Sequence, residues 1–161
     1  MSYIPLPPIQ HLPRLKVQQE LWGEQFDLSE YLNKKGNRDL AVAFASLFWP
    51  QFIEVDGCIL RAENYDPVSF QNWMKSTEGN RSQVESVLNH LHVYDLFQDD
   101  LEHPLEVYEY LAQILHRTWQ AALTEQFPDK KFKFHYATEP DDYGPTLYFW
   151  QDRQEEQGAT P

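Results

Sequence analysis

Hydrophobic and polar positions alternate most clearly in the last third of the chain. Over residues 131–136, phenylalanine and tyrosine alternate with lysine and histidine, and a period of two predicts a half-buried strand. Residues 145–150 are the expected partner strand after a polar connection. Tyr148 and Trp150 share one face of this partner. A face with two large aromatic rings is not a simple solvated face, so we expect another surface to cover it.

Four other stretches follow the period of a helix. Apolar residues recur there at intervals of three and four, which predicts amphipathic helices that bury one face. Two of the starts carry known patterns, the pair Asp66-Pro67 and the capping box from Ser82 to Glu85. The last helix follows Pro104 and would be about 34 Å long, the expected spine of the domain. The predicted helices cover residues 38–49, 67–76, 82–97 and 104–126.

A short apolar hairpin is predicted over residues 52–61. Asp56-Gly57 lies between two apolar runs, and this pair favours a two-residue turn between antiparallel strands. A single strand with a bulge at Gly57 is the alternative. The order helix, hairpin, helices, hairpin fits neither a bundle nor an alternating α/β fold. We therefore predict an α+β domain in which the two hairpins form one small antiparallel sheet and four or more helices pack on one of its faces.

A chain of 161 residues is expected to form one domain. Four of residues 1–13 are proline, which predicts an extended N-terminal arm. Such an arm either packs back on its own domain or clasps a neighbouring subunit, and the sequence leaves both open. The single α+β domain is expected to span 14–151, with a disordered acidic tail over 152–161.

The net charge of −12 at pH 7 narrows the range of partners. Affinity for nucleic acid or an anionic membrane depends on lysine and arginine, and we expect neither partner for 13 basic against 25 acidic residues. No stretch approaches the roughly 20 apolar residues of a membrane span, and no signal peptide is recognisable, so a cytoplasmic protein is predicted. The single cysteine, Cys58, excludes an internal disulfide and is expected to be buried.

Histidine and acidic residues near the end of the third predicted helix supply a candidate metal site. His92 and Asp95 are three residues apart, a spacing at which two ligands on a helix can share one ion. His90 would point elsewhere on a helix, but it would join His92 if the segment were a strand. His103 lies beyond the helix and could fold back. A helix with one exposed and one half-buried histidine explains the same residues without any metal.

Patterns typical of catalysis are missing from the sequence. There is no Gly-x-Ser-x-Gly motif and no glycine-rich phosphate loop, so no catalytic residue is predicted. No cofactor is predicted either, apart from the divalent metal of the alternative above. Trp22, Tyr148 and Trp150 are the predicted interface residues, because exposed tryptophan and tyrosine side chains mark contact surfaces.

Two stretches resemble a group of small bacterial proteins of unknown function. They are Phe48-Trp49-Pro50 leading into Ile53-Glu54-Val55-Asp56-Gly57, and Tyr143-Gly144-Pro145-Thr146. The resemblance covers roughly residues 37 to 151. It implies a bacterial cytoplasmic protein and no particular activity, and it assigns no functional residue.

The function predicted from these patterns is a non-catalytic protein-interaction module. Its partner would be a second copy of the chain in a homodimer, or a different protein for which the chain is an adaptor or an inhibitor or immunity-type partner. The prediction depends on the missing catalytic motifs, the acidic balance and the aromatic face with Tyr148 and Trp150. The alternative is a metal-dependent enzyme or metal-binding protein that uses the region of His92 and Asp95.

Overall fold

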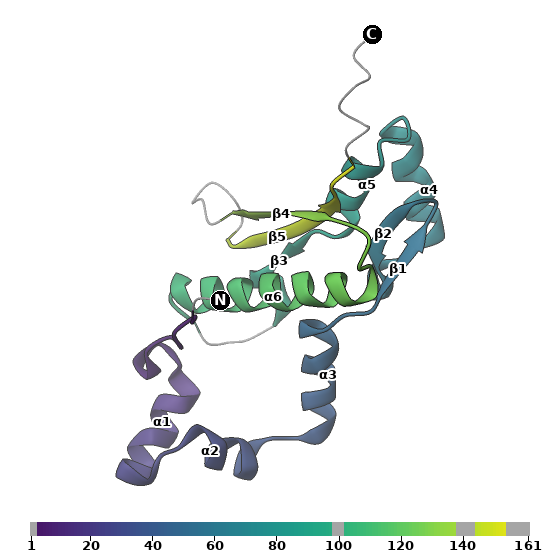
Figure 1. Ribbon diagram of the computed structural model, residues 1–161. Helices are drawn as coiled ribbons and strands as arrows, with labels where there is room; N and C mark the ends of the chain where they lie inside the picture. The colour runs from purple at the N-terminus through teal and green to yellow at the C-terminus, as the bar shows by residue number, and fades with distance from the viewer. Residues whose placement is uncertain (1–2, 98–101, 138–143, 154–161) are drawn as a thin grey trace.

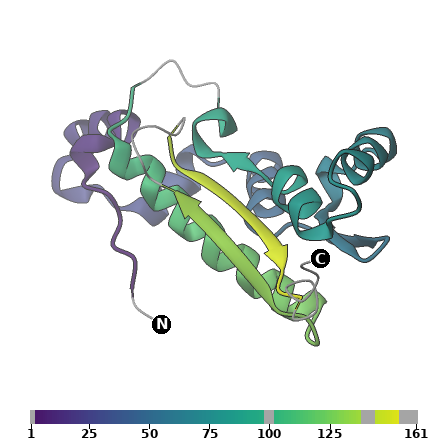
Figure 2. The same ribbon diagram turned by 90° about the horizontal axis from the view of Figure 1, so that it is seen from above.

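The computed structural model describes residues 3–97, 102–137 and 144–153. The longest element is α6, Leu105–Gln126, and a three-stranded antiparallel sheet lies along one side of it (Figure 1, Figure 2). The other elements are α1 Pro13–Trp22, α2 Leu28–Lys35, α3 Arg38–Phe48, β1 Phe52–Val55, β2 Cys58–Arg61, α4 Pro67–Ser76, α5 Arg81–Leu88, β3 Leu91–His92, β4 Phe132–Ala137 and β5 Thr146–Gln151, with short 3-10 helices η1 Ile9–His11, η2 Gly23–Gln25, η3 Ala62–Asn64 and η4 Val93–Leu96. The predicted α+β class is confirmed. No helix within the described ranges is long and apolar enough to cross a membrane.

The hairpin predicted at Asp56-Gly57 is confirmed. Strands β1 and β2 pair antiparallel with Val55 opposite Cys58, so only two residues form the turn. Both have a positive φ, 49° for Asp56 and 80° for Gly57, which is the type I′ geometry that matches the twist of the flanking strands. The Arg81 guanidinium donates from Nε to the carbonyl oxygen of Asp56 over 2.7 Å and ties the turn to the start of α5.

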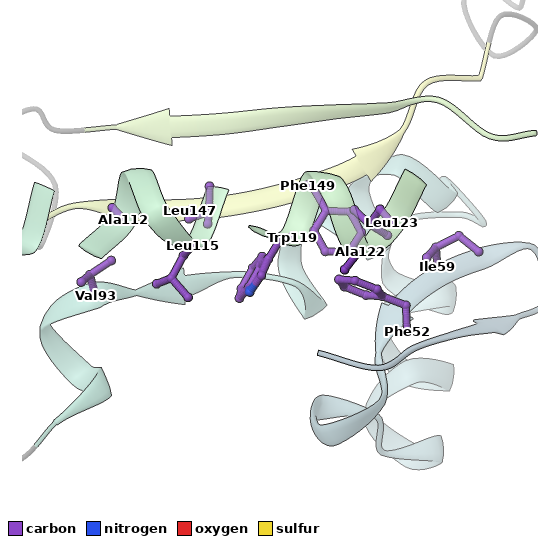
Figure 3. Packing of buried hydrophobic residues seen from close by; sticks show 10 residues of the cluster. All are labelled: Phe52, Ile59, Val93, Ala112, Leu115, Trp119, Ala122, Leu123, Leu147 and Phe149. Carbon is purple, nitrogen blue, oxygen red and sulfur yellow. The ribbon is translucent and has the colours of Figure 1, made fainter. Parts of the chain in front are cut away.

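The predicted spine helix and the second hairpin are also confirmed. Strand β5 pairs with β4 along its whole length, with Phe149 opposite Phe134, and the short β3 pairs with the other edge of β5. The apolar side of this sheet faces α6. Figure 3 shows the core between them, with Trp119 close to Phe149 and Phe52. The rings of Trp119 and Phe149 meet edge to face, 6.3 Å between centroids.

The helix predicted over 82–97 is wrong beyond Leu88. Helix α5 ends there, and the chain continues as β3 and η4. Apolar residues keep a helical spacing through this region, but Leu91 pairs with Leu147 of β5 instead of continuing the helix. The predicted capping box is wrong as well. Asn80 caps α5 by accepting a hydrogen bond from the amide of Gln83, and Glu85 is fully buried.

The prediction of one sheet from both hairpins is wrong too, because the strands form two separate sheets. Strands β2 and β5 are neighbours, yet Glu85 and Asn89 on one side of α5 take the place of hydrogen bonds between them. Backbone groups of Ile59 on β2 and of Phe149 and Gln151 on β5 bond to these two side chains. We call this junction, with Arg153, the inter-sheet seam.

The proline-rich arm packs back on its own domain. Residues 4–8 line a shallow pocket together with α6 residues Glu106, Glu109 and Tyr110, and His11 pairs with Glu106. At the other end, the backbone amide of Asp152 donates to the carbonyl of Lys131. The folded part therefore extends to residue 153, two residues into the predicted tail, and residues 154–161 lie outside the described ranges.

Helices α1, α2 and α3 form a feature that the sequence does not predict. Together they make an arch, residues 13–48, on the opposite side of α6 from the three-stranded sheet (Figure 1). The end of α3 reaches the rest of the domain, where Leu47 and Phe48 pack against the core. None of the three helices contains a buried residue. Within the described residues, the arch is therefore solvated on nearly all sides.

Candidate functional site

The structure brings two of the four candidate metal residues together. Because His90 and His92 flank Leu91 of β3, their side chains point to the same side, and their ring centroids are 4.5 Å apart. The expectation that His90 would point away from His92 is thus wrong, since it assumed a helix here. Nδ1 of His92 lies 3.0 Å from the hydroxyl oxygen of Thr146 on β5, which fixes the orientation of this ring.

Asp95 and His103 belong to other surroundings. Asp95 is exposed on η4, and the ring of His103 meets Tyr108 of α6 edge to face, 6.2 Å between centroids. His103 lines a pocket of about 240 Å³ with Val93, Tyr94, Phe97, Val107, Tyr108 and Leu111. Across residues 3–97, 102–137 and 144–153, no three His, Cys, Asp or Glu side chains are grouped as a metal site requires. A divalent metal in the region of His92 and Asp95 stays a prediction.

The outer face of the three-stranded sheet carries the predicted interface residues Tyr148 and Trp150. Both point away from α6, because Leu147 and Phe149, which alternate with them along β5, enter the core. The ring of Tyr148 stacks on that of His135 on β4, with 4.6 Å between the ring centroids and 20° between the ring planes. Its centroid lies 5.4 Å from that of His90 and 5.9 Å from that of Trp150. Both rings are half-buried against their neighbours, so much of the aromatic surface on this face is used within the chain.

Trp22, the third predicted interface residue, lies in the arch where α1 turns into η2. Its ring is 6.1 Å from that of Phe26, which is 6.5 Å from that of Tyr31 on α2. Nζ of Lys34 lies 4.7 Å above the Trp22 ring, a cation–π contact that adds to the corner. These contacts fix the angle between α1 and α2. They leave the apolar residues farther along each helix exposed.

The most elaborate polar cluster of the described residues is the inter-sheet seam. Arg153 binds Glu85 in a bidentate pair, 2.7 Å from Nη1 to Oε2 and 2.8 Å from Nη2 to Oε1. The same carboxylate accepts the amides of Ile59 at 2.7 Å and Gln151 at 2.9 Å, while Nη2 of Arg153 donates to the carbonyl of Gly57 at 2.6 Å. A fully buried carboxylate with four donors is a structural group, because each oxygen is already occupied.

Asn89 completes the seam one helical turn after Glu85. Its Oδ1 accepts the amide of Arg61 at 3.1 Å, and its Nδ2 donates to the carbonyls of Ile59 at 2.9 Å and Phe149 at 3.3 Å. Sequence reasoning missed this role for both residues. A signal exists in the spacing of Glu85 and Asn89, two polar residues four apart that directly follow the apolar pair Val84 and Leu88.

Cys58 lies in the second core cluster, with Leu60, Phe70 and Val84. Burial, together with the charge of Glu85, raises the pKa of its thiol to about 11. Because the thiolate is the reactive form, this cysteine is a poor nucleophile and supports no catalytic role.

We expect Cys58 to resist alkylation in the folded protein. At pH 8 the raised pKa alone lowers the thiolate fraction about 100-fold relative to an ordinary cysteine, and burial excludes the reagent as well. Iodoacetamide labelling followed by intact mass measures the rate, and the same protein unfolded in guanidinium chloride is the control. Equal rates in the folded and unfolded protein would show that the thiol is accessible.

Among the residues that the structure describes, the largest set of exposed apolar side chains lies on the arch. It consists of Val17 and Leu21 on α1, Leu28 and Leu32 on α2, and Leu40, Val42 and Phe44 on α3. Leu21 is 73% exposed, Val42 70% and Leu32 66%, although leucine and valine are usually among the most buried residues. This concentration of exposed apolar side chains makes the arch the candidate contact surface among the described residues.

Comparison with protein family models, with curated proteins and with solved structures finds no match. The resemblance to small bacterial proteins therefore stays a prediction, and the function has to be argued from the molecule itself.

Proposed function

We propose that the protein is a non-catalytic protein-interaction module whose contact surface is the arch, residues 13–48. The observation that carries the proposal is the exposure of apolar residues on all three arch helices while none of these helices has a buried residue. The contact residues predicted from the sequence are Trp22, Tyr148 and Trp150. The proposal retains Trp22 and moves the rest of the surface from the outer sheet face to the arch.

The lengths of the arch helices support a partner. They have 10, 8 and 11 residues, and isolated helices shorter than about 12–15 residues are marginal in water. Asp27 and Asn37 cap α2 and α3 by accepting backbone amides, which contributes only about 1 kcal/mol at each cap. In proteins most helical stability comes from packing of an apolar face. A partner that covers the exposed apolar residues of these helices supplies packing that the described part of the chain does not provide.

Site-specific photo-crosslinking tests the proposal. A photoreactive amino acid replaces Val42 on α3, 70% exposed, in the protein produced in its native cells. The matched control carries it in place of Val68 on α4, 68% exposed. We expect position 42 to give one discrete protein adduct, identified by peptide mass spectrometry, and position 68 to give none. No adduct at position 42, or the same adducts at both positions, would contradict the proposal.

A further inference from the structure

We infer that the partner covering the arch is a second copy of this chain, and that two arches pack against each other in a two-fold symmetric dimer. The inference depends on the proposed function, since it names the occupant of the same surface. A two-fold interface uses the same patch on both copies, and the arch is the patch that meets the requirements of charge, helix stability and size described below.

Charge is distributed very unevenly along the chain. Residues 1–48 contain five lysine or arginine and five aspartate or glutamate residues, so the remaining residues hold eight basic and twenty acidic ones and the whole net charge of −12. Within the arch, Lys34 and Glu30 pair at 2.8 Å, and Lys16 lies 4.0 Å from Glu20. Two copies repel each other wherever their acidic parts, residues 49–161, face one another. They can meet through the neutral arches, which keep the two acidic parts away from each other.

The same distribution argues against a basic partner on the arch. A strongly basic protein would be drawn to the acidic part of the chain, residues 49–161, and not to a segment whose charges already balance. The apolar residues of the arch fit a surface that is itself apolar and charge-balanced. A second arch has these properties by symmetry.

Helix stability points to the same partner. If the arch helices require an external surface to remain folded, that surface must be available whenever the protein is. A second copy of the chain meets this condition, because it is present at the same concentration. Obligate homodimers behave in this way, since their folding cannot be separated from association. The arch spans 36 residues and a stable interface uses about 20–30 residues on each side, so most of the arch would take part in the dimer interface.

Analytical ultracentrifugation of the untagged full chain tests the inference. We expect the wild-type protein to sediment as a dimer of twice 19.1 kDa in the micromolar range. The variant Leu21→Lys/Leu32→Lys should be monomeric, with dimerisation weakened at least roughly 100-fold, because two apolar contacts become charges that lose their water. Lysine and leucine have similar helix propensities. Lysine also lowers the net negative charge of the chain, so stronger repulsion between the acidic residues 49–161 of the two copies cannot explain dissociation.

The matched control is Val68→Lys, which places the same charge on an equally exposed position of α4 and should leave the dimer intact. A second measurement needs no variant: on dilution of the wild-type protein, the helical circular dichroism signal should fall together with the dimer fraction as α1 to α3 lose their packing. Dissociation of Val68→Lys to the same degree, or a dimer unaffected by the two arch lysines, would overturn the inference.

A wild-type monomer in the micromolar range would overturn it as well. In that case the photo-crosslinking experiment separates the two proposals. If position 42 then traps a different protein, the arch is still an interaction surface and only the second copy is the wrong partner. If it traps nothing, both proposals fail.

Discussion

Replacing Glu85 with glutamine should lower the free energy of unfolding by about 3–5 kcal/mol, the usual result of removing one partner of a buried ion pair. The glutamine side chain keeps one oxygen that can accept the backbone N–H of Ile59. Its NH₂ group, however, then faces the backbone N–H of Gln151 and the guanidinium of Arg153, which are donors as well. The guanidinium of Arg153 is left largely buried without its counter-charge. Denaturant unfolding followed by tryptophan fluorescence, at one fixed protein concentration, measures the loss.

The control is Glu125→Gln, the same change at an exposed position of α6, which should alter the free energy of unfolding by no more than about 0.5 kcal/mol. The double variant Glu85→Gln/Arg153→Gln tests the pairing itself. It should be less destabilised than the sum of the two single variants, with a coupling of about 0.5–3 kcal/mol. Additive losses, or equal losses for Glu85→Gln and Glu125→Gln, would show that the ion pair does not hold the seam together.

Replacing Trp119 with alanine should also lower the free energy of unfolding by about 3–5 kcal/mol. Its indole is fully buried, and Nε1 donates to the carbonyl of Leu47 at 2.9 Å, which fastens the end of α3 to the core. The Arg61 guanidinium lies 4.7 Å above the same ring. Arg61 is itself buried, and burial lowers the pKa of its guanidinium. Little water can therefore reach this charge to replace the aromatic ring that it contacts.

Trp73 on α4 provides the control for Trp119, since it is 38% exposed. Trp73→Ala should lower the free energy of unfolding by no more than about 1 kcal/mol. Trp119→Phe should give an intermediate loss, because it keeps a ring in the core and removes the hydrogen bond to Leu47. Both alanine variants can be followed by far-UV circular dichroism during denaturation, which needs no tryptophan signal. A Trp119→Ala variant no less stable than Trp73→Ala would contradict the packing in Figure 3.

Local patterns were sufficient to predict the elements whose structure is decided locally. Asp56-Gly57 favours the type I′ turn by its own backbone preferences, and the turn has that geometry. The alternation over 131–136 corresponds to β4, and the apolar stripe after Pro104 corresponds to α6. In these segments, the intrinsic preference of the chain and the tertiary contacts agree.

The prediction failed where tertiary contacts override a local pattern. The stretch from Val84 to Tyr94 has the spacing of one helix, but the pairing of Leu91 with Leu147 is available only once β5 is in place. The stretch from Ser82 to Glu85 has the residues of a capping box. In the structure, however, the Glu85 carboxylate instead accepts hydrogen bonds from the backbone of two strands and from Arg153. A single chain read by periodicity gives no indication of these partners.

The candidate site shows the same division. The sequence marked His90 and His92 as a pair that depends on the segment being a strand, and the strand β3 brings their rings together. The helix predicted over 38–49 corresponds to α3, but the arch as a whole was not predicted, since α1 has no apolar stripe that would distinguish it from a polar connection. Exposure of Leu21, Leu32 and Val42 becomes visible only when the rest of the chain is in place and leaves them uncovered.

The pairing of Glu85 with Arg153 also has a consequence for synthesis of the chain. Arg153 lies 68 residues after Glu85, and a ribosome adds about 5–20 residues per second, so the two are made roughly 3–14 s apart. During this interval the residues of the first hairpin and of α5 have been made, but the carboxylate of Glu85 must remain hydrated because its counter-ion has not been made. The centre of the nascent protein stays open for some seconds, and translation speed sets how long a chaperone has access to it.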